Sequence, residues 1–196
     1  MKKFLALVTL LCMVLTSTAA MATAIPSKTA DDLTQVEIGT TETGATVDPT
    51  FTVAVVEESE TVAAEIEAMR AVVAEEKPVV EYFPAEVKEE IAAVLPAETT
   101  VDTAVVYELV PMTVANYDEQ YGDVEVKIAL ATAFEEETEL VVLLGLPTVD
   151  GEGMDWTVKT GVVENGMVKV LFTQEELVAM ENVEALVVVM GAPIAE

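Results

Sequence analysis

The sequence predicts an α+β protein: an antiparallel β-sandwich, loosely immunoglobulin-like, with an N-terminal pair of helices covering one face. Three observations predict this class. After residue 101, short apolar or alternating runs follow one another with turn residues between them. Between residues 51 and 100, apolar residues instead recur at the spacing of a helix face. Residues 140–146 form an unbroken apolar run closed by a proline, which is typical of a strand buried on both faces.

Residues 1–24 have the three parts of a secretory signal peptide. A basic start is followed by an apolar stretch at 4–15 and by mostly small residues that end in Ala22-x-Ala24. We expect cleavage after Ala24, with Ala22/Thr23 as the second choice. Cleavage would place the mature protein outside the cytoplasm, either secreted to the extracellular space or in a periplasm. The apolar stretch is too short to span a bilayer comfortably, so we expect no stable membrane insertion after cleavage.

Cys12 is the one cysteine of the chain, and it lies inside the apolar stretch of the predicted signal peptide. Two leucines precede it where a lipoprotein signal would have a small residue, so we expect no lipid anchor. Cleavage after Ala24 would remove Cys12. The mature chain would then form no disulfide and offer no thiolate to a metal.

Residues 25–50 are rich in Thr, Ala, Asp, Glu, Gly and Pro and show no sustained period, which predicts a flexible linker. Residues 51–100 predict a helical cover or satellite subdomain after a short strand at 51–56. Two helices are expected there, because apolar stripes at helical spacing each end before a proline. These stripes are Val62, Ile66, Met69 and Val73 before Pro78, then Val87, Ile91 and Val94 before Pro96.

Residues 101–196 form the predicted sandwich domain, because the apolar period there changes to two. Pro111 interrupts the first strand, which indicates a sheet edge or a bulge. Asn165-Gly166 is a strong hairpin signal, and Thr173 with Glu176 predicts a capping box that begins a short helix. Six strands are expected, at residues 104–114, 124–131, 140–146, 156–163, 167–172 and 186–190.

Two of these strands, 140–146 and 186–190, are apolar on both faces. A strand of a two-sheet sandwich should instead be polar on its outer face. We therefore expect the helices of residues 51–100, or else a partner chain, to cover the second face. Because the last strand lies close to residue 196, we also consider an open sheet edge that could accept a strand from a partner.

Charge composition excludes some classes of partner. The 196 residues include 36 acidic and 9 basic side chains, for a formal net charge of -27. Nucleic acids and anionic membrane surfaces would be repelled by such a protein. The acidic surface is interpreted as a solubilising coat, with a cation-binding surface as the alternative hypothesis.

The residue inventory excludes most catalytic chemistries. The sequence has no histidine, and the predicted mature chain has no cysteine, so Ser-His-Asp, Cys-His and histidine-ligated metal sites are impossible. No glycine-rich phosphate-binding pattern occurs. Paired carboxylates could still hydrolyse a glycoside. With so many acids in the chain, however, a suitable pair carries little information.

Two groups of residues are candidates for ligand binding. Asp150, Glu152 and Asp155 offer oxygen donors on a glycine-rich loop, as a hard cation such as calcium requires, although Met154 breaks the EF-hand pattern. No other cofactor is expected. Trp156, Tyr117 and Tyr121 could form a platform on which a sugar stacks, with burial of Trp156 in the core as the alternative.

The sequence therefore predicts an exported, non-enzymatic binding or structural module whose partner is an unidentified protein or glycan. One alternative is a calcium-dependent or carbohydrate-binding module that uses the loops at 117–123 and 148–156. A second alternative is a small glycoside-active enzyme that uses two carboxylates.

Overall fold

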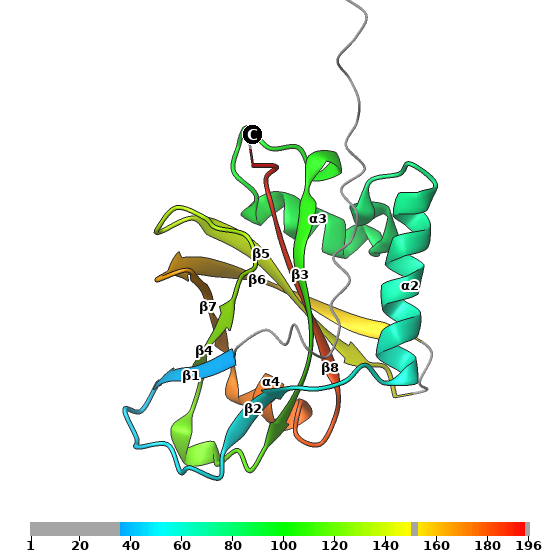
Figure 1. Ribbon diagram of the computed structural model, residues 1–196. Coiled ribbons are helices and arrows are strands. Elements are labelled where there is room, and N and C mark those ends of the chain that lie inside the picture. The colour runs from blue at the N-terminus through cyan, green and yellow to red at the C-terminus, as the bar shows by residue number, and fades with distance from the viewer. Residues whose placement is uncertain (1–35, 150–152, 195–196) are drawn as a thin grey trace, which may run out of the picture.

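The computed structural model describes residues 36–149 and 153–194. Within these residues, eight strands form one sheet in the order β1-β4-β7-β6-β5-β8-β3-β2, and every neighbouring pair is antiparallel (Figure 1). The strands are β1 (Val36–Thr41), β2 (Thr52–Val55), β3 (Val105–Ala115), β4 (Val124–Ala129), β5 (Glu139–Pro147), β6 (Met154–Glu164), β7 (Met167–Phe172) and β8 (Ala185–Gly191).

The sheet curls until its two edge strands, β1 and β2, approach each other, which makes it nearly barrel-shaped (Figure 1). A β-rich, mostly antiparallel protein with few helices is therefore what the structure shows. The predicted two-sheet sandwich and its likeness to an immunoglobulin domain are not confirmed. The reason is that β5 pairs with β6 on one side and β8 on the other, so hydrogen bonds run through the centre of the sheet without a break.

The first strand lies inside the range that the sequence predicts to be a linker. Val36, Glu37 and Ile38 of β1 pair with Ile128, Lys127 and Val126 of β4. The prediction of a flexible linker over 25–50 is therefore wrong for residues 36–41. Val36 and Ile38 alternate and pack against the core, but two apolar residues are too few to show a period in the sequence.

One apolar cluster, which we call the inner core, fills the inside of the curled sheet. All eight strands contribute to it, and Leu177 and Met180 add the buried side of α4 (Gln174–Ala179) and the residue that follows it. The packing is tight, because a Cβ added to Gly161 would lie 2.4 Å from a methyl group of Val168. The inside of the sheet is therefore occupied by side chains in this region.

A second cluster, the outer core, lies on the outer face of β3, β5, β6 and β8 beneath the helices. Figure 1 shows α2 (Glu60–Ala74) and α3 (Ala85–Val94) on that side of the sheet. The short 3-10 helices η2 (Val79–Tyr82) and η3 (Val101–Thr103) accompany them, and a third, η4 (Glu119–Tyr121), follows β3.

The helices complete the burial of β5 and β8. In β5, Val142 and Leu144 belong to the inner core, whereas Val141 and Leu143 belong to the outer core. The expected cover for these two-faced strands is thus the helical segment of the same chain. Its fully buried contacts include Val62, Ile66, Met69 and Ile91.

Two details of the strands differ from expectation. β8 lies between β5 and β3 in the middle of the sheet, so the hypothesis that the last strand offers an open edge is wrong. β3, which contains Pro111, is not an edge strand either, and its register shift lies between Val106 and Glu108 rather than at Pro111, which pairs regularly with Leu186. The predicted hairpin turn is present, with Asn165 and Gly166 both at positive φ.

In the described part of the chain, none of the helices combines the length and the apolar character that a membrane span requires.

Candidate functional site

The structure separates the three predicted platform residues. Tyr117 and Tyr121 pack with Phe51 in the inner core, where they are 9% and 1% exposed, so they cannot form a surface platform. Their hydroxyls have structural partners. The Tyr117 hydroxyl donates to the carbonyl of Gly122 at 2.6 Å, and the Tyr121 hydroxyl accepts from the backbone N–H of Asp48 at 2.9 Å.

The predicted calcium loop is described only in part. Asp150 and Glu152 lie outside the described residues. Asp155 is exposed at the start of β6, and it faces away from Trp156 because neighbouring side chains of a strand point to opposite faces. Among the described residues no cluster of three or more acidic side chains is placed to hold a metal ion.

Trp156 is half-buried at the edge of the outer core. It pairs across the sheet with Gly145 of β5. A Cβ added to Gly145 would lie 2.7 Å from the Trp156 ring, closer than a real Cβ approaches another group. The glycine therefore lets the indole lie directly against the backbone of β5.

Two further aromatic rings surround Trp156, and we call Tyr82, Phe83 and Trp156 the aromatic corner. The ring centroids of Phe83 and Tyr82 lie 5.1 Å and 6.1 Å from that of Trp156, and those two rings lie 4.9 Å apart. All three rings are close to mutually perpendicular, with interplanar angles of 83°, 86° and 88°. Phe83 is buried, whereas Tyr82 and Trp156 are half-buried and reach the surface.

Local sequence explains how the chain holds this corner. Tyr82 ends η2 and Phe83 follows it in an extended conformation. Pro78 and Pro84 are the N-cap residues of η2 and α3, so the segment between the two prolines continues neither neighbouring helix. The aromatic pair is therefore held on a short, separate turn against β6.

Glu65 adds a carboxylate to the aromatic corner. It projects from α2, and its side chain accepts a hydrogen bond from the Tyr82 hydroxyl. Burial raises the pKa of the Glu65 carboxyl. Gly153, at the end of the predicted calcium loop, lies close by, since a Cβ there would be 3.9 Å from Glu65 Oε1. Figure 1 shows the beginning of β6 beside α2.

The basic side chains of the described residues are all engaged elsewhere. Each of the six forms an ion pair with a carboxylate other than that of Glu65. The pairs are Arg70–Glu67, Lys77–Glu75, Lys88–Glu81, Lys127–Glu164, Lys159–Glu176 and Lys169–Glu125. Among the described residues, Glu65 therefore has a tyrosine hydroxyl rather than a cation as its polar partner.

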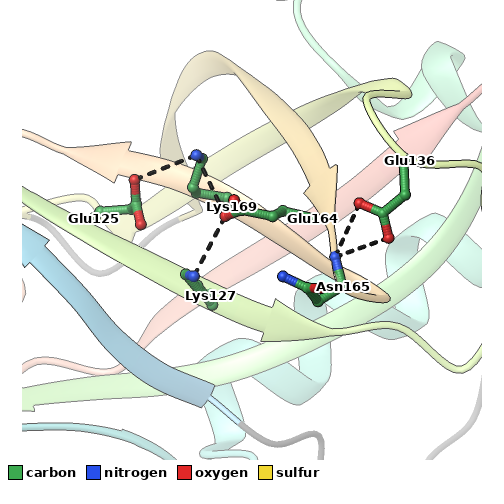
Figure 2. Close-up of polar contacts among 6 residues, drawn as sticks. All are labelled: Glu125, Lys127, Glu136, Glu164, Asn165 and Lys169. Carbon is green, nitrogen blue, oxygen red and sulfur yellow. Dashed lines mark hydrogen bonds and ion pairs between the residues drawn. The ribbon is translucent and has the colours of Figure 1, made fainter.

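A charged network covers the outward face of β4, β6 and β7 (Figure 2). Lys127 and Lys169 lie directly opposite each other in neighbouring strands, where like charges repel. Glu164 lies between them, 3.3 Å from Lys127 Nζ and 3.4 Å from Lys169 Nζ. The hydrogen bond from Lys127, with Lys169 beside it, holds the pKa of Glu164 below its usual range. This network balances charge on a solvent-facing sheet, and we assign no ligand to it.

The same region joins two loops (Figure 2). The carboxylate of Glu136, in the connection from β4 to β5, accepts from the backbone N–H of Asn165 at 3.0 and 3.1 Å. Glu164 precedes that asparagine in the chain. The contact fixes the hairpin turn and is structural.

Sequence reasoning finds Trp156 but misses its partners. Tyr82 lies 74 residues before Trp156 and Glu65 lies 91 residues before it. Neither belongs to a recognisable motif. The one available signal is the pair Tyr82-Phe83 between Pro78 and Pro84. A search against protein-family models, curated proteins and solved structures finds no match to this chain.

Proposed function

We propose that the protein is an exported, non-enzymatic binding module and that its ligand contacts the aromatic corner and Glu65. The observation that carries the proposal is the convergence of three separate elements at one surface point. Half-buried Trp156 from β6, Tyr82 from η2 and Glu65 from α2 meet there. Small-molecule sites commonly combine aromatic walls with a small number of placed polar groups.

A binding role suits this group better than a catalytic role. Glycoside hydrolysis requires two carboxylates about 5–10 Å apart with separate roles. The aromatic corner contributes aromatic surface and Glu65 contributes a carboxylate, which together are enough to orient a ligand. Export is proposed from the signal-peptide pattern of residues 1–24.

Intrinsic fluorescence gives a direct test, because Trp156 is the only tryptophan in the chain. We expect a saturable change in emission when a suitable saccharide or amine is titrated into the protein. Tyr82→Leu should weaken that response, because the ligand loses one ring. Tyr117→Phe is the matched control in the inner core and should leave it unchanged. A flat response to neutral, acidic and amino-bearing compounds would contradict the proposal and favour a structural role.

A calcium-dependent module is the second candidate. The observation that favours it is the proximity of Gly153 to Glu65, which brings one end of the predicted calcium loop beside the aromatic corner. Calcium bound by Asp150, Glu152 and Asp155 would then place a cation on the loop that ends beside this corner, with the Asp155 side chain on the face of β6 opposite to Trp156. This candidate predicts that calcium raises the melting temperature more than magnesium does.

A further inference from the structure

Resting on the proposed function, we infer that the ligand of the aromatic corner carries an ammonium group, which contacts Trp156 and Tyr82 and is balanced by the carboxylate of Glu65. The shared chemistry is a positively charged nitrogen. It could belong to an amino sugar or to a quaternary ammonium compound, and the experiment below separates these two sources.

The ring geometry favours a compact cation over a flat sugar face. The rings of Trp156 and Tyr82 are 86° apart with centroids separated by 6.1 Å. A flat ligand can stack on one such ring but not on both. A small, nearly spherical ammonium can contact both at once, and cations are attracted to ring faces within about 6 Å of the centroid, most strongly for Trp.

The third ring holds the other two in place. Phe83 is 3% exposed and packs edge-to-face against both Tyr82 and Trp156. The two half-buried rings are therefore supported from behind by a buried one. A site whose rings are already fixed loses less conformational freedom when a ligand binds.

Charge points to the same class of ligand. The protein carries a formal net charge of -27, and each basic side chain of the described residues is paired with a carboxylate. Anionic ligands are therefore repelled and cationic ligands attracted. Glu65 is partly removed from water and its described polar partner is the Tyr82 hydroxyl, so an ammonium would give this carboxylate a counter-charge.

The test compares charged probes with their uncharged analogues. The purified protein is titrated with choline and with its uncharged analogue 3,3-dimethylbutanol, and separately with glucosamine and N-acetylglucosamine. Trp156 fluorescence is the readout, and calorimetry provides a second measurement. We expect the charged member of at least one pair to bind roughly tenfold more tightly, as a partly desolvated cation–π contact implies.

Variants assign the effect to the aromatic corner. Glu65→Gln keeps the shape of the side chain and should weaken binding of the charged probe about tenfold. Glu67→Gln is the matched control, because it removes the same charge from the same helix at an exposed residue that pairs with Arg70. A similar loss in both variants would show that only overall charge matters and would overturn the inference. Thermal melting of each variant confirms that it is folded.

The outcomes separate this inference from the proposed function. Tighter binding of choline identifies a quaternary ammonium, and tighter binding of glucosamine identifies an amino sugar. Equal binding of charged and uncharged probes would overturn the ammonium preference and leave the binding module standing. No response to any of the four probes or to neutral and acidic saccharides would overturn both.

Discussion

At the scale of single residues, Glu65 is notable because folding partly removes its charge from water. Burial raises the pKa of its carboxyl in the folded protein. The ionised form is therefore disfavoured by folding, and this penalty is present above the folded pKa and disappears below the unfolded one.

Glu65→Gln should accordingly raise the melting temperature slightly near neutral pH, because the amide has no charge to desolvate and can still accept from Tyr82. The gain should shrink as the pH falls from the raised folded pKa to the ordinary carboxyl pKa, and it should be absent below that value. Melting curves of both proteins across that range measure it. A lower melting temperature for the variant near neutral pH would mean that Glu65 stabilises the fold.

The ionised carboxylate of Glu164 has the opposite effect on folding stability to that of Glu65. Its pKa is lowered by the hydrogen bond from Lys127 and by Lys169, so it adds stability above its unfolded pKa and loses it as the pH falls through the folded pKa. Glu164→Gln should therefore lower the melting temperature near neutral pH and have little effect in acid. Glu139→Gln, an exposed carboxylate on β5, is the control. Equal effects of the two substitutions would contradict the role given to the lysine pair.

At the scale of elements, the contact between β5 and β6 depends on Gly145, which has no side chain and so leaves room for the Trp156 ring. Gly145→Ala would place a Cβ 2.7 Å from the Trp156 ring, so the indole must move. We expect a loss of about 1–3 kcal/mol, as overpacking typically causes, together with a change in tryptophan emission. Urea unfolding and emission spectra measure the two effects.

Gly161→Ala provides the comparison, since a Cβ there would lie 2.4 Å from Val168 in the inner core. It should also destabilise the protein but leave the emission spectrum unchanged. A change of emission in both variants would mean that the two cores are not independent.

The helices and the sheet share the outer core, so they should unfold together. Ile66 of α2 is 1% exposed in that core. Ile66→Ala should cost about 2–5 kcal/mol, as deletion of a buried aliphatic side chain does. Val178→Ala, at a 46% exposed position on α4, should have a much smaller effect.

For Ile66→Ala and for Val178→Ala we expect one urea transition. Far-ultraviolet circular dichroism and Trp156 fluorescence should both report it at the same urea concentration. Two separate transitions would instead support a satellite subdomain at residues 51–100.

At the scale of the whole molecule, a net charge of -27 makes any cation stabilising to some degree. A specific site is recognised by a difference between cations. If a calcium site of about 1 mM affinity exists, about 10 mM calcium should add roughly 1.4 kcal/mol. That corresponds to a rise of about 3–6 °C in melting temperature at this size.

Melting in chelator, magnesium and calcium decides between the two candidates. The calcium-dependent module predicts a rise with calcium well above that with magnesium, and Asp155→Asn should reduce it. Equal small rises in melting temperature with calcium and magnesium would indicate screening of the acidic surface and would contradict a specific calcium site.

Much of the fold is readable from the sequence because it depends on local pattern. The stripes from Val62 and Val87 predict α2 and α3, and the Asn165-Gly166 pair predicts the β6–β7 hairpin. The apolar character of β5 on both faces even predicts that a second layer covers it, and the helices of the outer core do so. Each of these features follows from side-chain periodicity or turn chemistry within a few residues.

The sequence by itself thus determined α2, α3 and most of the strands, with the apolar faces that they bury, whereas the tertiary structure decided how these elements meet. A two-residue period in the sequence shows that a strand has two faces, but it does not show which strand lies beside it. For this reason one curled sheet replaces the expected sandwich, and β1 joins it through only a few apolar residues. Tyr82 and Glu65 reach Trp156 for the same reason: packing across long chain separations brings them together, and no local pattern records it.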